Sequence, residues 1–336
     1  NFKPKIFIKK NKVFFKKIKK LYKHSKIKIY NDHKFIKKEK KVDITVSAIP
    51  GIAGLLPTIQ YAKKSKLILL ANKESVICGW RLLSKVLKNN KTKLIPIDSE
   101  HYSIKKLLES NEKSPIKKIY ITASGGPFLN KKNTKNITPK LALNHPKWNM
   151  GKKISIDSAT MMNKLFELVE AQKLFKQYKD KIKIIIHPQS LIHAIIEYEN
   201  GLSKMLFHQP HMIIPISNAL LNNNSKIKKY YTITEKHNFK KFDFIEINKK
   251  NFPPFKILPI LNRYESLPII INAANEILVD HFLRKKISFN GIMKLLSSVL
   301  KDKNFKKYAI QIPHNINIIN KIDRWSRETT LRIIKK

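Results

Sequence analysis

Apolar residues in the middle of the chain form short runs that alternate with segments of helical spacing. The runs at 43–49, 66–71 and 93–97 are rich in β-branched residues and have the length of buried strands. The segment 74–89, between two of them, has the apolar spacing of a helix. Strands that alternate with helices predict a parallel α/β sheet with right-handed crossovers. The segments predicted as helices near the C-terminus are 267–286, 290–301 and 314–335.

A second group of strands is predicted further along the chain, with a polar, irregular linker after it at 224–256. Asn200-Gly201 is a hairpin signal between two of these strands. A long helix is predicted from Ser158 to about Gln177, and a strand–helix–strand unit within residues 1–41. The predicted strands of this second group are 116–123, 153–157, 183–187, 192–199 and 202–208.

The chain carries a formal net charge of +46, from 63 lysines and only six arginines among its basic residues. Such a charge is typical of proteins that bind nucleic acid or anionic membranes. Base and phosphate recognition favours arginine, however, and functional basic surface is clustered, whereas these lysines are spread along the chain. We therefore expect no nucleic acid and no membrane among its partners. A lysine-rich nucleic-acid-binding protein is kept as the alternative function.

The single cysteine, Cys78, excludes an intramolecular disulfide and a cysteine-built zinc site, and it favours a reducing compartment. No apolar run approaches the roughly 18 residues that a membrane span needs. The eight glycines include no G-x-G-x-x-G motif and no Walker P-loop.

Asp98, Ser99 and Glu100 directly follow the predicted strand 93–97. In open α/β sheets, ligands bind beyond the carboxyl ends of the strands. Residues i and i+2 of an extended segment point the same way, so the carboxylates of Asp98 and Glu100 are expected to converge. Two hard oxygen donors without cysteine suit Mg²⁺ or Mn²⁺. An ordinary acidic helix N-cap is the alternative interpretation.

A second polar cluster lies on the helix predicted to begin at Ser158. Asn163, Glu167 and Glu170 fall at i, i+4 and i+7, so they share one face. A solvated helix face is the alternative, but acidic residues are scarce, 23 in 336, and their density here favours a site. Ser158 and Thr160 in the first turn, with the free N–H groups of a helix start, predict an anion site.

Further candidates lie in turns and loops. Ser124-Gly125-Gly126 can form a nest of N–H groups for phosphate, or simply a tight turn. The loop 145–151 can close over a ligand as a lid, or be a loop held by one buried tryptophan. Lys73 follows a strand, although a solvated lysine is the common alternative. His187 and His193 are interpreted as core or interface histidines.

Seven segments together resemble one known family. The block 145–164 is the most specific, and the similarity extends from about residue 5 to 335. The sequence resembles the 1-deoxy-D-xylulose 5-phosphate reductoisomerases, which make 2-C-methyl-D-erythritol 4-phosphate in non-mevalonate isoprenoid biosynthesis. The segments are AGLLPT (53–58), LLANKES (69–75), DSEH (98–101), SGGPF (124–128), HPKWNMGKKISIDSATMMNK (145–164), HPQSLIH (187–193) and NAANE (272–276).

The resemblance implies an NADPH-dependent rearrangement and reduction with Mg²⁺ or Mn²⁺. It implies that Asp98, Glu100 and Glu167 bind the metal, and that Lys73 acts beside them in catalysis. The implied contacts with NADPH are Asn72, Glu74 and Gly151, and Trp148 and Met150 belong to the implied lid. The implied contacts with the small phosphorylated sugar are Lys73, Ser99, Glu100, Ser124, His145, Ser158, Asn163, Lys164 and Glu167.

Three departures from the family pattern bear on activity. The family's glycine-rich turn for the NADPH pyrophosphate has no counterpart here, so we expect this 336-residue chain to bind NADPH weakly and to be inactive at ordinary NADPH levels. Leu165 replaces a usual glycine and is expected to crowd the cavity, and His211 replaces a usual acid beside Met212. An inactive pseudoenzyme is a further alternative, against which the retained Lys73 and Ser158 and the three carboxylates argue.

The expected fold class is α/β, with an incomplete Rossmann-like N-terminal domain, an α/β catalytic domain and a C-terminal α-helical domain. We expect residues 1–96 to be the N-terminally truncated NADPH-binding domain and 97–225 to bind metal and substrate. Residues 226–256 are the expected linker and 257–336 the helical domain. The resemblance also implies a homodimer in the bacterial cytoplasm, or in a plastid-like stroma if the source is eukaryotic.

Overall fold

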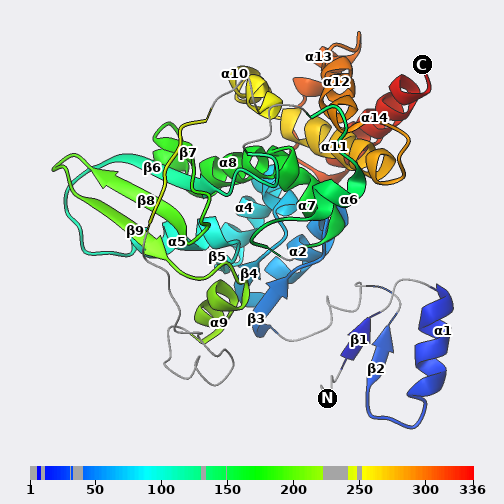
Figure 1. Cartoon of the computed structure of the whole chain (residues 1–336). Helices are drawn as coiled ribbons and strands as arrows, with labels where there is room; N and C mark the ends of the chain where they lie inside the picture. The colour runs from blue at the N-terminus through cyan, green and yellow to red at the C-terminus, as the bar shows by residue number, and fades with distance from the viewer. Residues whose placement is uncertain are drawn as a thin grey trace.

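Within the described residues, the computed structural model has three sheets and a C-terminal group of helices (Figure 1). The first sheet is a parallel pair, β1 (Ile6–Ile8) and β2 (Lys28–Tyr30), connected through α1 (Lys12–Leu21). This pair agrees with the strand–helix–strand unit predicted for the N-terminal residues. The structure describes residues 6–8, 12–30, 32, 41–129, 134–148, 150–221, 241–247 and 252–336.

The second sheet has the parallel order β3-β4-β5, as the alternating pattern predicted. β4 and β5 end next to the segments that carry Lys73 and Asp98, because Asn72 and Asp98 directly follow the apolar runs 66–71 and 93–97. The strands are β3 (Val42–Ser47), β4 (Ser65–Leu70) and β5 (Lys93–Pro96). The helices of this region are η2 (Ile52–Gly54), α2 (Leu55–Ala62), α3 (Glu74–Ile77), α4 (Trp80–Asn89) and α5 (Ser99–Leu108).

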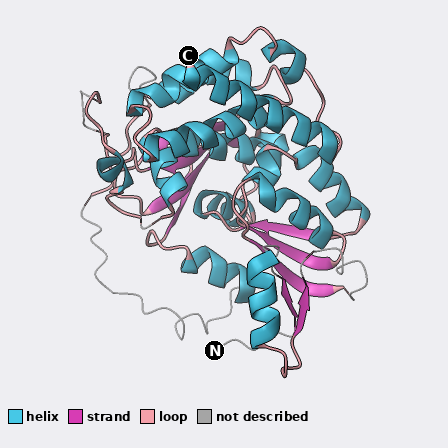
Figure 2. Cartoon of the chain, turned by 90° about the vertical axis from the view of Figure 1, so that its right-hand side faces the viewer, coloured by secondary structure: helices cyan, strands magenta, loops and turns pink. Residues whose placement is uncertain are grey.

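The third sheet has the order β7-β6-β8-β9, in which β6 pairs with β7 in parallel and with β8 antiparallel. The hairpin predicted at Asn200-Gly201 joins β8 to β9, with Gly201 at a φ of 84° that suits glycine. Figure 2 shows the strands in separate groups, with helices packed around and between them. The strands are β6 (Ile116–Ala123), β7 (Ile182–Ile186), β8 (Ile192–Tyr198) and β9 (Ser203–Phe207).

The segment 153–157 is helical, so the prediction of a strand there is wrong. It lies in α7 (Lys152–Ala159), which follows the short α6 (Pro139–Leu143). The alternating isoleucines misled the sequence analysis, because five residues are too few to separate a strand repeat from a helical one. In the structure, Lys153 Nζ donates to Asp157 Oδ2 at 2.9 Å, an i,i+4 contact that the helix provides.

The long helix predicted from Ser158 is also wrong in its start and in its length. Ser158 lies in the last turn of α7, and Met161 takes a left-handed φ of 64° before α8 (Met162–Leu174) begins. Thr160 Oγ1 donates to the Ile156 carbonyl at 3.1 Å, a local side-chain bond of the kind that ends or bends helices. Neither Ser158 nor Thr160 is therefore in the first turn of a helix. A short 3-10 turn, η3 (Lys176–Tyr178), follows α8.

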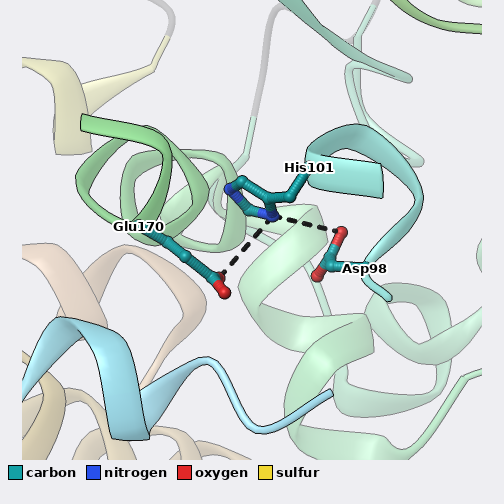
Figure 3. Close-up of side chains that lie close together, drawn as sticks. All are labelled: Asp98, His101 and Glu170. Atoms are coloured by element: carbon teal, nitrogen blue, oxygen red, sulfur yellow. Dashed lines mark ion pairs between the residues drawn. The ribbon is translucent and has the colours of Figure 1, made fainter. Parts of the chain in front are cut away.

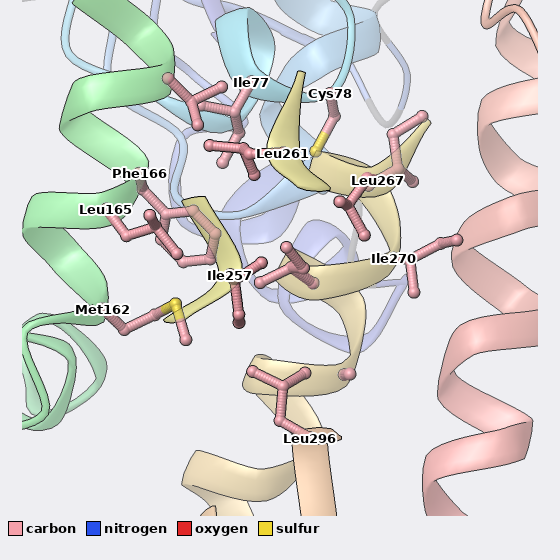
Figure 4. Close-up of a cluster of buried hydrophobic side chains, with 14 of the residues drawn as sticks. Ile77, Cys78, Met162, Leu165, Phe166, Ile257, Leu261, Leu267, Ile270 and Leu296 are labelled. Atoms are coloured by element: carbon pink, nitrogen blue, oxygen red, sulfur yellow. The ribbon is translucent and has the colours of Figure 1, made fainter. Parts of the chain in front are cut away.

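The C-terminal part is helical, as predicted, and it packs against the rest through the largest apolar core (Figure 4). Leu165 is fully buried in this core beside Met162 and Phe166, so the expectation that it crowds the cavity is wrong. The elements are η5 (Pro253–Ile257), α10 (Leu258–Leu261), α11 (Leu267–Leu283), α12 (Phe289–Leu300), α13 (Phe305–Ala309) and α14 (Ile316–Lys335).

The predicted linker at 224–256 falls largely on residues 222–240 and 248–251, which lie outside the described ranges. Within its described part, Ile245 makes an antiparallel bridge to Ile186 at the edge of the third sheet. The helix before it is α9 (Ile213–Leu221). Across the described residues, no helix combines the length and the apolar character needed to cross a membrane.

Candidate active site

A cavity of about 560 Å³ lies where β4, β5 and β6 end and where α7 and α8 meet. The strand-end argument predicted this location. Thr160 and Glu170, which were candidates from helix spacing, do not line the cavity. The residues that the resemblance implies for metal, sugar or cofactor all line it: Asn72, Lys73, Glu74, Asp98, Ser99, Glu100, Ser124, His145, Gly151, Ser158, Asn163, Lys164 and Glu167.

Asp98, Glu100 and Glu167 bring one carboxylate oxygen each to within 4.8 Å of one another. The predicted convergence is confirmed, but the predicted reason is wrong, because only Asp98 is extended. It is the N-cap of α5, and Glu100 lies in the first turn of that helix. The Asp98 side chain does not cap the helix, so its oxygens remain directed at neighbouring side chains.

Two lysines lie among these carboxylates. Lys73 Nζ is 3.2 Å from both Asp98 Oδ2 and Glu167 Oε1, and it donates to Asn163 Oδ1 at 2.7 Å. Lys164 Nζ donates to Glu100 Oε1 at 2.6 Å and also pairs with Glu167. The Lys73 side chain is 12% exposed, which excludes the alternative of a solvated surface lysine.

The pKa values of the carboxylates in this cluster are shifted in different directions. Burial and the neighbouring Glu167 raise the pKa of Glu100 to about 7, although Lys164 opposes this shift. Burial also acts to raise the pKa of Asp98, but Lys73 and His101 outweigh it and hold the pKa of Asp98 below its usual range. Crowding of the carboxylates thus adds to burial in raising the pKa of Glu100. Three hard oxygen donors around one point fit Mg²⁺ or Mn²⁺.

The turn after β6 lies against α7. Gly126 has a φ of 68°, and a Cβ there would be 2.7 Å from the Ser158 carbonyl oxygen. Only glycine therefore allows Ser124 and Ser158 to line the same wall of the cavity. His145 Nδ1 accepts the Trp148 N–H at 3.0 Å, which leaves Nε2 to carry the proton and donate to Ser124 Oγ at 3.0 Å.

The loop that carries Trp148 contacts the third sheet. The Trp148 ring meets the His193 ring edge to face, with centroids 6.0 Å apart. His193 in turn stacks on His208 at 3.8 Å and is 2% exposed, and His187 is fully buried. Both histidines are buried, as the interpretation of core histidines expects, but His193 also lines the cavity, and His187 Nε2 has no hydrogen-bond partner among the described residues.

At the other end of the cavity, Asn72 and Glu74 lie at the start of α3, opposite Gly151. Asn72 Nδ2 donates to Glu74 Oε2 at 3.0 Å and to the carbonyl oxygen of Ile49 at 2.7 Å. Gly151 is the N-cap of α7, and a Cβ placed on it meets nothing within 4 Å. This end therefore combines an oriented carboxylate with open space.

Comparisons with known proteins identify the family. The family model for 1-deoxy-D-xylulose 5-phosphate reductoisomerase matches residues 1–79, and two models for its C-terminal domains match 94–175 and 207–329. The enzyme of this name from Pelagibacter ubique is 46% identical over 90% of this chain and 80% of its own length. That from Wolbachia pipientis wMel is 42% identical over 88% and 76%. The chain belongs to the 1-deoxy-D-xylulose 5-phosphate reductoisomerase family.

Solved structures of reductoisomerases share this fold. A crystal structure of DOX-P reductoisomerase in complex with NADPH, fosmidomycin and magnesium has a TM-score of 0.90 at 32% identity, over 99% of this chain and 86% of that one. The Zymomonas mobilis reductoisomerase in complex with NADPH has a TM-score of 0.86 at 30% identity, over the same shares. The α/β fold class is thereby confirmed, and these similarities favour a reductoisomerase over a nucleic-acid-binding protein.

The reductoisomerase site contains a buried histidine for which the sequence analysis assigned no role. His101 Nδ1 lies 3.8 Å from Asp98 Oδ1 and 3.7 Å from Glu170 Oε2 (Figure 3), and its Nε2 is 2.9 Å from the Glu167 carbonyl oxygen. Burial lowers the pKa of His101, but Glu170 and Asp98 outweigh burial and raise it. His101 therefore links both helices that carry the carboxylates. Its position directly after Asp98, Ser99 and Glu100 was the feature of the sequence that could have indicated a role in the site.

The sequence analysis also assigned no role to Lys153 and Asp157, which line the cofactor end of the cavity. Their i,i+4 spacing was visible in the sequence, but it indicates a contact only in a helix, and a strand was predicted over 153–157. His211, the third departure from the family pattern, is exposed, and its Nδ1 accepts the Ile213 N–H at 3.1 Å.

Proposed function

We propose that this cavity converts 1-deoxy-D-xylulose 5-phosphate to 2-C-methyl-D-erythritol 4-phosphate with NADPH and Mg²⁺ or Mn²⁺. The observation that carries the proposal is the convergence of Asp98, Glu100 and Glu167 beside Lys73 in one buried cavity. Those three carboxylates would hold the ion. When bound, the ion supplies Lewis-acid polarisation of the ketone and hydroxyl oxygens of the sugar.

Lys73 is the residue proposed to stabilise negative charge on the reacting oxygens. Burial lowers its pKa, but Asp98 and Glu167 outweigh burial and raise it well above the usual value, so its ammonium group persists at neutral pH. A fixed positive charge in a cavity of low dielectric stabilises a developing oxyanion without reorganisation. Asn163 accepts from Lys73 Nζ and thereby holds the ammonium group in place.

The sugar phosphate is proposed to lie against Ser124, Ser158, Asn163 and Lys164, with His145 beside Ser124. The hydroxyl groups and the ammonium group can each donate to a phosphate oxygen. Lys164 pairs with Glu100 and Glu167 in this structure, so binding of the phosphate would exchange these carboxylates for phosphate oxygens. The same movement would free both carboxylates for the ion.

The reduction step is proposed to take place at the end lined by Asn72, Glu74 and Gly151, where NADPH would lie next to the sugar. Trp148 and Met150 would cover the reacting groups and exclude water. The proposed organisation places the cofactor domain at 1–96, the metal and substrate domain at 97–225 and the helical domain at 257–336. A homodimer is part of this proposal and is tested by sedimentation equilibrium.

The metal assignment is tested by calorimetric titration of Mn²⁺ into Glu167→Gln. We expect the metal affinity to fall at least a hundredfold, since one of three anionic ligands is lost. Glu265→Gln is the control, because Glu265 is exposed and pairs only peripherally with Arg81. Equal metal affinity in Glu167→Gln and in the control would remove Glu167 from the site.

A further inference from the structure

A chain of polar contacts runs from the C-terminal helices to the cofactor end of the cavity. It begins at Asn275, which is fully buried in α11. Asn275 Nδ2 donates to Asp157 Oδ1 at 2.7 Å, across 118 positions of sequence. Asp157 is 1% exposed and lies on α7, so this bond joins two helices inside the protein.

The chain continues along the wall of the cavity. The second oxygen of Asp157 accepts from Lys153 Nζ at 2.9 Å, and the same Nζ lies 3.7 Å from Glu74 Oε1. Glu74 Oε2 accepts from Asn72 at 3.0 Å. Lys153 is thus held between two buried carboxylates, and one of these carboxylates belongs to the proposed cofactor site.

The positive charge of Lys153 explains why the position of its side chain matters for binding the cofactor. Burial lowers the pKa of Lys153, but Asp157 and Glu74 outweigh burial and raise it, so the side chain is cationic at neutral pH. Without this cation, two carboxylates would face an anionic cofactor and repel it. The position of the cation depends on Asp157, and Asp157 has one amide donor to fix its orientation, Asn275.

Asn275 and Asn272 are both fully buried amides of α11, and the Oδ1 atom of each has no hydrogen-bond partner among the described residues. They differ in what their Nδ2 groups bind: Asn272 donates to Glu276 Oε1 at 3.2 Å within the helix, whereas Asn275 donates to Asp157 on α7. A buried amide that is only half satisfied is unfavourable for stability. The hydrogen bond from Asn275 to Asp157 is therefore the contact that offsets the cost of burying this amide.

We propose that Asn275 is a positioning residue for the cofactor: it orients Asp157, which holds Lys153 beside Glu74. The inference rests on the proposed placement of NADPH at Glu74. It gives the C-terminal helical region a part in cofactor binding, although Asn275 itself does not line the cavity.

The test is Asn275→Leu, which keeps the branched shape of the side chain and removes the donor. NADPH affinity, measured by quenching of protein fluorescence, should fall about tenfold, the loss expected for one charge-assisted hydrogen bond. The KM for the sugar phosphate should change by less than about twofold, because Lys164 and Ser124 are untouched. Ser326→Ala is the control: it removes another buried polar contact to α11, the 2.8 Å bond to the Ile270 carbonyl, and neither of these residues lines the cavity.

A double variant separates positioning from simple structural support. Asp157→Asn with Asn275→Asp restores an amide–carboxylate bond between the helices but moves the negative charge away from Lys153. We expect its melting temperature to recover and its NADPH affinity to remain weak. Recovery of NADPH affinity in the swap, or unchanged affinity in Asn275→Leu, would overturn the inference. If the leucine variant does not fold, Asn275→Ala also removes the donor and provides the same comparison.

Glu74→Gln distinguishes this inference from the function on which it rests. Weaker NADPH binding in Glu74→Gln with unchanged binding in Asn275→Leu would reject the positioning role alone. Unchanged NADPH binding in both variants would reject the cofactor assignment of Glu74 and the inference with it.

Discussion

The two ends of the cavity hold lysines between carboxylates in different ways. At the metal end, Lys73 and Lys164 contact Asp98, Glu100 and Glu167, and most partners of these carboxylates are long side chains that can exchange. At the cofactor end, Lys153 lies between Asp157 and Glu74, and each carboxylate also accepts from a buried amide, Asn275 or Asn72.

This difference between the partners of the carboxylates shows how one cavity can bind two kinds of ligand. A metal ion must replace the lysines as the counter-charge, so the carboxylates at that end need cations that can leave. A cofactor bound through hydrogen bonds gains from groups whose orientation is already fixed. At the metal end the carboxylates are crowded and the pKa of Glu100 is raised. At the cofactor end the carboxylates are fixed by hydrogen bonds from amide groups.

The largest effect is expected for Lys164→Ala, which removes one of the two cations at the metal end. Loss of the ammonium group should raise the KM for the sugar phosphate about a hundredfold, since charge-assisted bonds to phosphate contribute about 1.5–3 kcal/mol each. Mn²⁺ affinity should be retained or rise, because Glu100 and Glu167 lose a competing cation. Steady-state kinetics and calorimetry provide the two measurements. An unchanged KM would remove Lys164 from the phosphate site.

Gly126→Ala should disturb both ends at once, because α7 carries Ser158 toward one and Lys153 toward the other. The new methyl group would lie 2.7 Å from the Ser158 carbonyl oxygen, and α7 would have to shift. We expect a loss of about 2 kcal/mol in the free energy of unfolding, measured by urea denaturation. Gly201→Ala is the control, since its φ is also positive but nothing lies within 4 Å. Equal losses in the two variants would mean that strain alone matters.

The sequence predicted the strands well where apolar runs were long and bounded. The eight-residue run at 116–123 coincides with β6, and Asn200-Gly201 forms the predicted hairpin. The prediction failed at 153–157, where isoleucine alternation over five residues also fits one turn and a half of a buried helix.

The carboxylates of the site were predictable because they follow a strand or share a helix face. The resemblance added the sugar and cofactor contacts, which no spacing rule supplies. Asn275 and its bond to Asp157 were not predictable, because that pair depends on how α11 packs against α7 across 118 positions. His101 is a similar case, since its contact with Glu170 requires the packing of α5 on α8.

The pH dependence of metal binding tests the role of Glu100 at the metal end. The pKa of Glu100 lies near 7 without metal, so below that pH the ion must displace a proton. Mn²⁺ affinity should therefore fall by up to about tenfold per pH unit below about pH 7 and level off above it. Calorimetry in two buffers of different ionisation enthalpy would show proton release near pH 6. Affinity that is flat from pH 5.5 to 8 would contradict the role of Glu100.

The last prediction concerns stability alone and tests Lys173, which connects α8 with α3. It lies on α8 with Glu167, and its Nζ donates to the Ile77 carbonyl at the end of α3 at 2.8 Å. Burial lowers its pKa from 10.5 to about 8. The unfolded chain therefore binds the proton more tightly, and the stability contributed by Lys173 is full above pH 10.5 and declines as the pH falls to about 8.

Lys173→Met removes this titration. The free energy of unfolding of the variant relative to the unsubstituted protein should be most favourable below pH 8 and should decrease as the pH rises toward 10.5. We expect this difference to change by about 3 kcal/mol between pH 8 and pH 10.5, since each unit of pKa shift corresponds to about 1.4 kcal/mol. The lost bond to Ile77 adds an offset that does not vary with pH. Urea denaturation at pH 7, 8, 9 and 10 measures it, with the exposed Lys176→Met as the control. A difference that is constant with pH would show that Lys173 is held as an ordinary cation and that α8 and α3 are joined by a fully charged contact.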